Sequence, residues 1–362
     1  MKALAKCRGK RGRIARAFRL GGWGWVLFLI CGAPAAAPRQ ARQPSRPVVV
    51  SPRLAAGIAE FRQFHFRRAA AAFRAVELAH PGKTGALLWL AKCRINLGQL
   101  AMAQNDLETF LARKPRSDDA LSLLGFVDFR RHHPHRSLAA YARAASIQPP
   151  LGDDYKIMGL DYIALRDWKH ARRELARAVR LEPQNLQAQY YLAWMQYIAN
   201  QFTPASRRLQ RLARAEPRNL NVLTLLGLTL EAQSHFRRAA AIFLKAIALE
   251  PGLQARNAQP YIGYGILLER TGHPRQAGRQ LRAALRIKPA SFRALAHLGH
   301  IDLMLNRLPP AERELTAALR LNPRYRPAYY QLAQVYRREG KITQERLALQ
   351  ELAKLPLHNV PQ

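Results

Sequence analysis

The sequence predicts an all-α fold, an α-solenoid built from stacked helix–turn–helix units. Three observations predict it: a proline that recurs every 34 residues, columns of small residues that keep the same period, and columns of large apolar residues in register with them. A chain of 362 residues could hold two average globular domains or one extended repeat array. The recurring positions favour the array.

The prolines mark the same point in successive units. Six of them stand 34 residues apart, and two more follow after steps of 38 and 34 residues: Pro81, Pro115, Pro149, Pro183, Pro217, Pro251, Pro289 and Pro323. Proline lacks a backbone N–H and clashes with the preceding helical turn, so each is expected to end the second helix of its unit.

Two further columns predict how the helices of a unit pack. A small residue stands 24 positions before each proline: Gly57, Ala91, Gly125, Gly159, Ala193, Gly227, Gly265 and Gly299. A large apolar residue stands eight positions before it: Phe73, Leu107, Tyr141, Leu175, Leu209, Phe243, Leu281 and Leu315. A small residue on the first helix lets the second approach closely, and the large side chains fill the seam. A third column, twelve before the proline, is Ala except at Ser137.

Period, two-helix unit and columns together resemble the tetratricopeptide repeat. The resemblance runs from about Ser51 to Pro356 and implies a right-handed superhelix of about nine repeats. The last unit departs from the pattern, with Glu345 where Ala is expected, which suits a C-terminal cap. Four extra residues between Pro251 and Tyr261 lengthen one connection, as surface loops tolerate cheaply.

The N-terminus is predicted to be a secretory signal over residues 1–37. Eight basic residues and no acid precede the apolar run Trp23–Cys31, and an Ala-rich stretch follows it. The apolar run is short for a membrane span, and an uncleaved N-terminal anchor is the alternative. Residues 38–50 are expected to be a Pro/Arg-rich linker and residues 357–362 a tail. The chain is therefore expected to be exported, in the periplasm or cell envelope.

The sequence favours a protein that is not an enzyme. It contains no phosphate-binding loop, no zinc-protease motif, no nucleophile elbow and no cysteine pair with zinc spacing. We expect no cofactor and no metal. The histidines His132, His133 and His135 lack acidic or thiol companions and are expected to form a solvated turn, and Cys93 is expected to be a buried, unreactive thiol.

The family resemblance implies a binding groove lined by the first helices. On α-helical register Tyr190, Trp194 and Tyr197 share one face of one such helix, and aromatic side chains are frequent anchors of recognition surfaces. The other residues predicted for the groove are Lys156, Arg270, His300, Tyr330, Arg337 and Arg338, with Phe126, Phe129, Glu231 and Glu269 as neighbours. Packing against the next repeat is the alternative role, above all for Trp194, Phe126 and Phe129.

The formal net charge of +36 is the unusual feature of the composition. Basic residues recur at three positions of the second helices, on what is expected to be the outer, convex wall. These are Arg173, Arg177, Arg180, Arg207, Arg211, Arg214, Lys245, Arg279, Arg286, Arg313 and Arg320. Such a ridge could hold a polyanion, whereas an Arg-rich composition is the competing explanation.

Three functions are consistent with these features. The first is an envelope scaffold that binds peptide or helical segments of other proteins in its groove. The second is a polyanion-binding protein whose outer ridge takes anionic lipid or polysaccharide, or nucleic acid if the chain is cytoplasmic. The third is an accessory that presents a catalytic partner to its substrate. The sequence specifies no oligomeric state.

Overall fold

The protein is all-α over the residues that the computed structural model describes, which are 52–356 without 83–84 and 250–256. These residues form eighteen helices and no strand. The predicted signal, linker and tail lie outside them, as does most of the lengthened connection after Pro251. No helix in this part of the chain combines the length and the apolar character that a membrane span needs.

The helices fall into two compact units, divided after Ser234. The N-terminal unit holds α2 (Pro52–Arg62), α3 (Phe66–Ala79), α4 (Ala86–Asn96), α5 (Leu100–Arg113), α6 (Asp118–Arg130), α7 (Pro134–Ala145), α8 (Gly152–Ala164), α9 (Trp168–Leu181), α10 (Leu186–Ile198), α11 (Phe202–Ala215) and α12 (Leu220–Ala232). The C-terminal unit holds α13 (Phe236–Ala248), α15 (Gln259–Arg270), α16 (Pro274–Ile287), α17 (Phe292–Met304), α18 (Leu308–Leu321), α19 (Arg326–Arg338) and α20 (Ile342–Lys354).

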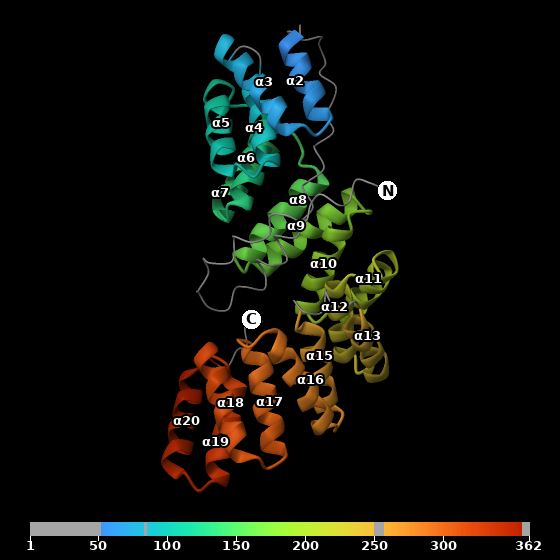
Figure 1. Cartoon of the computed structure of the whole chain (residues 1–362), viewed down its shortest axis with the longest axis vertical. Coiled ribbons are helices and arrows are strands. Elements are labelled where there is room, and N and C mark those ends of the chain that lie inside the picture. The colour runs from blue at the N-terminus through green and yellow to red at the C-terminus, as the bar shows by residue number, and fades with distance from the viewer. Residues whose placement is uncertain (1–51, 83–84, 250–256, 357–362) are drawn as a thin grey trace. The chain divides into compact units, whose positions relative to one another are not determined.

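Each unit is a stack of helix pairs, as the sequence predicts (Figure 1). A first helix packs against its own second helix, and that second helix packs against the first helix of the next pair. First helices also touch one another from pair to pair, as α4 touches α6 and α17 touches α19. Among the described residues no second helix packs as extensively against the next second helix. The first helices therefore lie on the inner wall of each unit and the second helices on its outer wall.

The contact between the small column and the large apolar column brings the helices of a pair together. A Cβ atom placed on Gly125 would lie 2.7 Å from the ring of Tyr141, and one on Gly159 would lie 2.7 Å from Leu175. Tyr141 and Leu175 are almost completely buried, and so are the other large residues of their column. Glycine at these positions thus removes the atom that would hold the two helices apart.

The turn between the helices of a pair repeats one backbone conformation. In each of nine successive turns one residue has a positive φ angle, between 55° and 79°. These residues are Phe64, Gly98, His132, Arg166, Asn200, Ser234, Gly272, Asn306 and Gly340. Only three of these are glycine, the residue that adopts this conformation without strain. The regular turn is therefore imposed by the packing of the helices on either side of it.

The second helices end close to the prolines. Helix α5 stops at Arg113, two residues before Pro115, and α18 stops at Leu321, two residues before Pro323. Helix α7 ends earlier, at Ala145, and a short turn separates it from Pro149. The position of helix termination was thus predictable from proline chemistry.

Buried acids interrupt the apolar seams. Asp161 on α8 is 2 % exposed, and burial raises the pKa of its carboxyl to about 8, although the nearby Ser137 hydroxyl acts in the opposite direction. Asp128 on α6, which is also buried, adds a negative charge that raises this pKa further. Asp161 is therefore protonated in the folded protein at neutral pH.

We expect Gly299→Ala to destabilise the protein and Gly278→Ala to leave it unchanged or more stable. A Cβ on Gly299 would lie 2.7 Å from Leu315 and 3.2 Å from the Ala311 carbonyl, so the free energy of unfolding should fall by about 1–3 kcal/mol. Gly278 lies inside a helix with nothing nearer than 3.4 Å, so alanine should gain about 0.5–1 kcal/mol of helix propensity. Thermal melting of both variants measures this, and equal melting temperatures would contradict the close approach.

We expect Asp161→Asn to flatten the dependence of stability on pH. The pKa of Asp161 is higher in the folded protein than in the unfolded chain, so the unfolded chain releases this proton first. The contribution of Asp161 to the free energy of unfolding is fully present below the pKa that this residue has in the unfolded chain. That contribution is lost as the pH rises toward about 8. Melting curves between about pH 5 and pH 8 should show a smaller decline for the variant than for the natural protein. Parallel declines in the two proteins would mean that Asp161 ionises normally.

Candidate partner-binding surfaces

The inner wall of the N-terminal unit carries an aromatic face on α10. Tyr190, Trp194 and Tyr197 are spaced i, i+4 and i+7, and each is partly exposed. The buried Tyr191 lies behind them, with its ring centroid 5.4 Å from that of Tyr190 and 6.5 Å from that of Trp194. The structure thus places the three predicted aromatic residues on one helix of the inner wall.

The surroundings of this face hold its rings in place. Burial raises the pKa of Tyr190 well above its ordinary value and that of Tyr191 to about 12, so both phenols stay neutral. The ring of Tyr197 packs 5.7 Å from that of Phe202, at the start of α11. Aromatic rings that are held by their neighbours lose little conformational entropy when a partner binds.

Polar groups of the preceding pair adjoin α10. Lys156 on α8 donates a hydrogen bond to Asp153 at 2.6 Å, and Asn185, which caps α10, donates to the same carboxylate at 2.9 Å. The predicted groove residue Lys156 therefore has a carboxylate partner within its own unit.

Three residues named as neighbours of the groove differ in exposure, and the burial of Phe129 fits the alternative role of packing within the stack. Phe129 is 8 % exposed and Glu231 is 6 % exposed, so both are packed within the stack. Phe126 remains partly exposed and its ring faces the Arg130 guanidinium at 5.7 Å. Helical register alone does not separate Phe126 from Phe129, because the two residues are three positions apart on the same helix.

The inner wall of the C-terminal unit holds a carboxylate between two imidazoles. Glu269 on α15 accepts hydrogen bonds from Nδ1 of His297 at 2.8 Å and from Nδ1 of His300 at 2.5 Å, both on α17. Burial alone would raise the pKa of Glu269, but the two histidines outweigh it and lower the pKa to about 2. The sequence predicted His300 and Glu269 for this wall but did not identify His297, which is three positions from His300.

The other residues predicted for this wall are largely engaged by the protein itself. Arg338 donates a hydrogen bond to the Leu303 carbonyl at 2.9 Å, at the end of α17, and Arg337 pairs with Glu345 at 2.6 Å. The Arg270 guanidinium lies 5.4 Å from the centre of the Phe236 ring. Tyr330 is accessible on the inner wall, with 55 % of its surface exposed.

The predicted basic ridge lies on the second helices, and ten of its eleven residues are exposed. The exception is Arg177, which is half-buried because it folds over the Tyr155 ring. Arg173 and Arg177 both pair with the buried carboxylate of Glu174, at 2.8 and 3.0 Å. These two arginines therefore neutralise an internal charge in α9.

Helix α11 differs from α9 because it contains no acid. Arg207, Arg211 and Arg214 are exposed and, with Gln210, line an open depression on the outer wall of the N-terminal unit. No carboxylate of the described residues forms an ion pair with any of these three arginines. Arg208, on the same helix, instead reaches Gln189 and Gln196 of α10.

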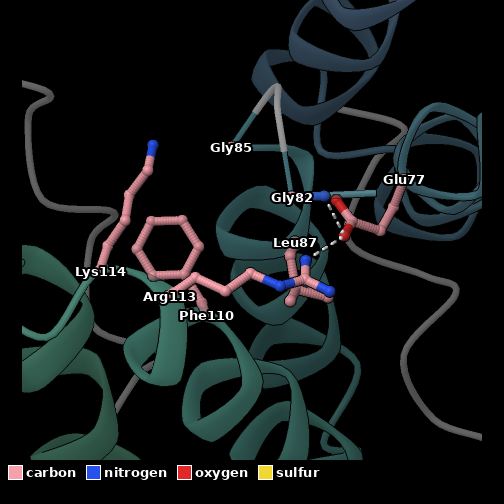
Figure 2. A pocket seen from close by; sticks show the side chains of 7 residues that line it. All are labelled: Glu77, Gly82, Gly85, Leu87, Phe110, Arg113 and Lys114. Carbon is pink, nitrogen blue, oxygen red and sulfur yellow. Dashed lines mark hydrogen bonds and ion pairs between the residues drawn. The ribbon is translucent and has the colours of Figure 1, made fainter. Parts of the chain in front are cut away.

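A small pocket is lined by residues between Glu77 and Lys114, and hydrogen bonds across it stabilise the N-terminal unit. Glu77 accepts hydrogen bonds from the Gly82 backbone N–H at 2.8 Å and from Arg113 at 3.0 Å, which ties the turn after α3 to the end of α5 (Figure 2). Lys114 points away from this contact and lies beside the Phe110 ring (Figure 2). The lining residues are thus already paired or turned outward.

The cysteine and the histidine cluster singled out from the sequence lie in the core and at the turn after α6. Cys93 is fully buried, and burial raises the pKa of its thiol to about 12, which keeps it protonated and unreactive. His132 occupies the left-handed turn position, and His133 lies 3.7 Å from Asp128. Within residues 52–356, less the two gaps, no cluster of histidine, cysteine and acidic residues is arranged to hold a metal ion.

Comparison with known families supports the repeat that the sequence resembles. Residues 54–101 and 158–205 match the family model described as "Tetratricopeptide repeat". Among curated proteins no sequence matches the chain. Tetratricopeptide-repeat folds typically mediate protein–protein interactions and are generally non-catalytic scaffolds.

Solved structures similar to this one share its fold at low sequence identity. One is the APC/C hetero-tetramer Cut9–Hcn1, with a TM-score of 0.57 and 16 % identity over 81 % of this chain and 57 % of that one. The present chain thus spans little more than half of that protein. Another is a tetratricopeptide repeat protein from Parabacteroides merdae, with a TM-score of 0.55 and 14 % identity over 69 % of this chain and 97 % of that one. A monomeric mutant of IFIT1 with Gppp-AAAA has a TM-score of 0.51 and 15 % identity over 75 % of this chain and 70 % of that one.

Proposed function

We propose that this protein is a non-enzymatic scaffold of the cell envelope that binds peptide or helical segments of other proteins. The single observation that carries the proposal is the aromatic face of Tyr190, Trp194 and Tyr197 on the inner wall of the N-terminal unit. Large rings that are partly exposed and held from behind suit the anchoring of an apolar or aromatic side chain of a partner.

The arrangement around this face supports a peptide over a small molecule. The pockets beside Glu77 and on α11 do not involve these rings, which lie partly exposed along one helix of the wall. Lys156 and Asp153 on α8 add a charged pair along the direction of the stack, which could orient a partner's polar groups. Extended segments and amphipathic helices use this combination of spaced apolar anchors and flanking polar contacts.

The envelope location rests on the sequence of residues 1–37. Their basic head, apolar core and Ala-rich end have the order of a secretory signal, or of an anchor if the segment is retained. Partners would then be other envelope proteins, with the scaffold either free in the periplasm or tethered to the membrane.

We expect the double substitution Trp194→Ala and Tyr197→Ala to weaken partner binding strongly without unfolding the protein. Loss of two central anchors should cost about 2 kcal/mol or more, roughly a thirtyfold drop in affinity. A photo-reactive amino acid placed at position 194 or 197 in cells should form discrete protein adducts, which mass spectrometry identifies. The affinity of each identified partner for the natural and doubly substituted proteins is then measured by titration.

Matched positions on the outer wall provide the control. Arg143 and Arg180 are exposed on second helices of the same unit, and the photo-reactive residue at these sites should give no adduct with the same partner. Adducts from the outer positions alone, or unchanged affinity in the double variant, would refute the inner-wall proposal.

We also expect the mature protein to be recovered from the periplasmic or membrane fraction. N-terminal sequencing of the tagged native protein should find a new N-terminus near Ala36 or Pro38 if the signal is cleaved. An intact N-terminus in the membrane fraction would indicate the retained anchor. An intact Met1 in the cytoplasmic fraction would rule out the envelope location and leave the inner-wall surface to be tested separately.

A further inference from the structure

Helix α11 presents an unbalanced positive charge on the outer wall of the N-terminal unit. Arg207, Arg211 and Arg214 follow one another at i, i+4 and i+7, so a single face of the helix presents all three guanidinium groups. Gln210 lies between them and completes the lining of the depression. Because α11 contains no acid, this positive charge is not neutralised within the helix.

The arginines of α11 differ from those of α9, which has a glutamate on the same helix. Helices α7, α13 and α16 are also basic and contain no acid. The equivalent arginines of α9, Arg173 and Arg177, form ion pairs with the buried Glu174. On α11 the charges instead repel one another: burial lowers the pKa of Arg208, and the adjacent Arg211 lowers it further. An anion bound at this face would relieve that repulsion.

We propose that the α11 face, defined by Arg207, Gln210, Arg211 and Arg214, binds the phosphate groups of an anionic phospholipid membrane. The planar guanidinium fork matches phosphate oxygens and can donate two parallel hydrogen bonds to them. The face is open and lies on a single helix, so it can contact headgroups without a cavity that encloses them.

Two observations favour a lipid surface over nucleic acid. Single-stranded nucleic acid usually stacks its bases on aromatic side chains, and the single aromatic residue of α11, Phe202, packs against Tyr197. The sequence also places an apolar run, Trp23–Cys31, behind a basic N-terminal head, which brings the chain to a membrane during export. A basic patch strengthens the membrane attachment of a chain that has a second, apolar signal.

Vesicle binding by the full chain tests this inference. The natural protein is compared with the triple variant Arg207→Gln, Arg211→Gln, Arg214→Gln on vesicles of phosphatidylcholine with about 30 % phosphatidylglycerol and on pure phosphatidylcholine. At about 0.15 M salt, the variant should lose roughly tenfold or more of its partition onto the anionic vesicles, and the difference should shrink at about 0.5 M salt. Both proteins should bind pure phosphatidylcholine equally.

The matched control removes the same charge elsewhere in the same unit. Arg53, Arg62 and Arg116 are exposed and lie outside the second helices, so their triple Gln variant should lose less than about twofold. The N-terminal segment is identical in all three proteins, so its own attraction to the vesicles cancels in the comparison. Circular dichroism and melting temperature establish that each variant is folded.

Three outcomes would overturn the proposal. Equal losses in the two triple variants would mean that net charge alone drives binding. Unchanged vesicle binding in the α11 variant would mean that these arginines do not meet the membrane. A labelled single-stranded oligonucleotide is tested in parallel, and loss of oligonucleotide binding with intact vesicle binding would assign the face to nucleic acid.

Discussion

The close approach of the two helices in each pair is the constraint on which the rest of the structure depends. Glycine or alanine on the first helix faces a fully buried large side chain on the second, as Gly125 faces Tyr141 and Gly299 faces Leu315. Distances of about 2.7 Å from the would-be Cβ leave no room for another atom. Since each second helix also packs on the next first helix, one misplaced pair would displace its neighbours in the stack.

This packing gives the two walls of each unit different chemistry. First helices contact one another along the inner wall. Side chains of these helices that do not enter the seam, such as Trp194 and His300, are partly exposed on this wall. Second helices are set further apart, so their outward positions remain accessible to solvent and carry most of the exposed arginines. A solenoid can therefore offer a protein partner and a charged surface separate faces, and the two proposed interactions do not compete for the same residues.

Buried acids show how the same scaffold accommodates charge in two ways. Glu174 is 1 % exposed and receives two arginines, and the two histidines beside Glu269 keep it ionised. Asp161 has no cation of this kind, and burial keeps it protonated to about pH 8. An arginine on a helix surface is thus engaged within the protein where an internal carboxylate lies within its reach.

Periodicity by itself determined the helix pairs, the small and large columns that meet in each seam and the prolines that end the second helices, because each follows from local geometry repeated at a constant step. It also placed Tyr190, Trp194 and Tyr197 on one helix face. Only the tertiary structure decided that Phe129 is buried and that His297 and His300 both bind Glu269. It also decided that Arg177 pairs with the buried Glu174, whereas Arg211 has no such carboxylate beside it among the described residues. These distinctions depend on contacts between residues of different helices, and helical spacing within one segment carries no information about them.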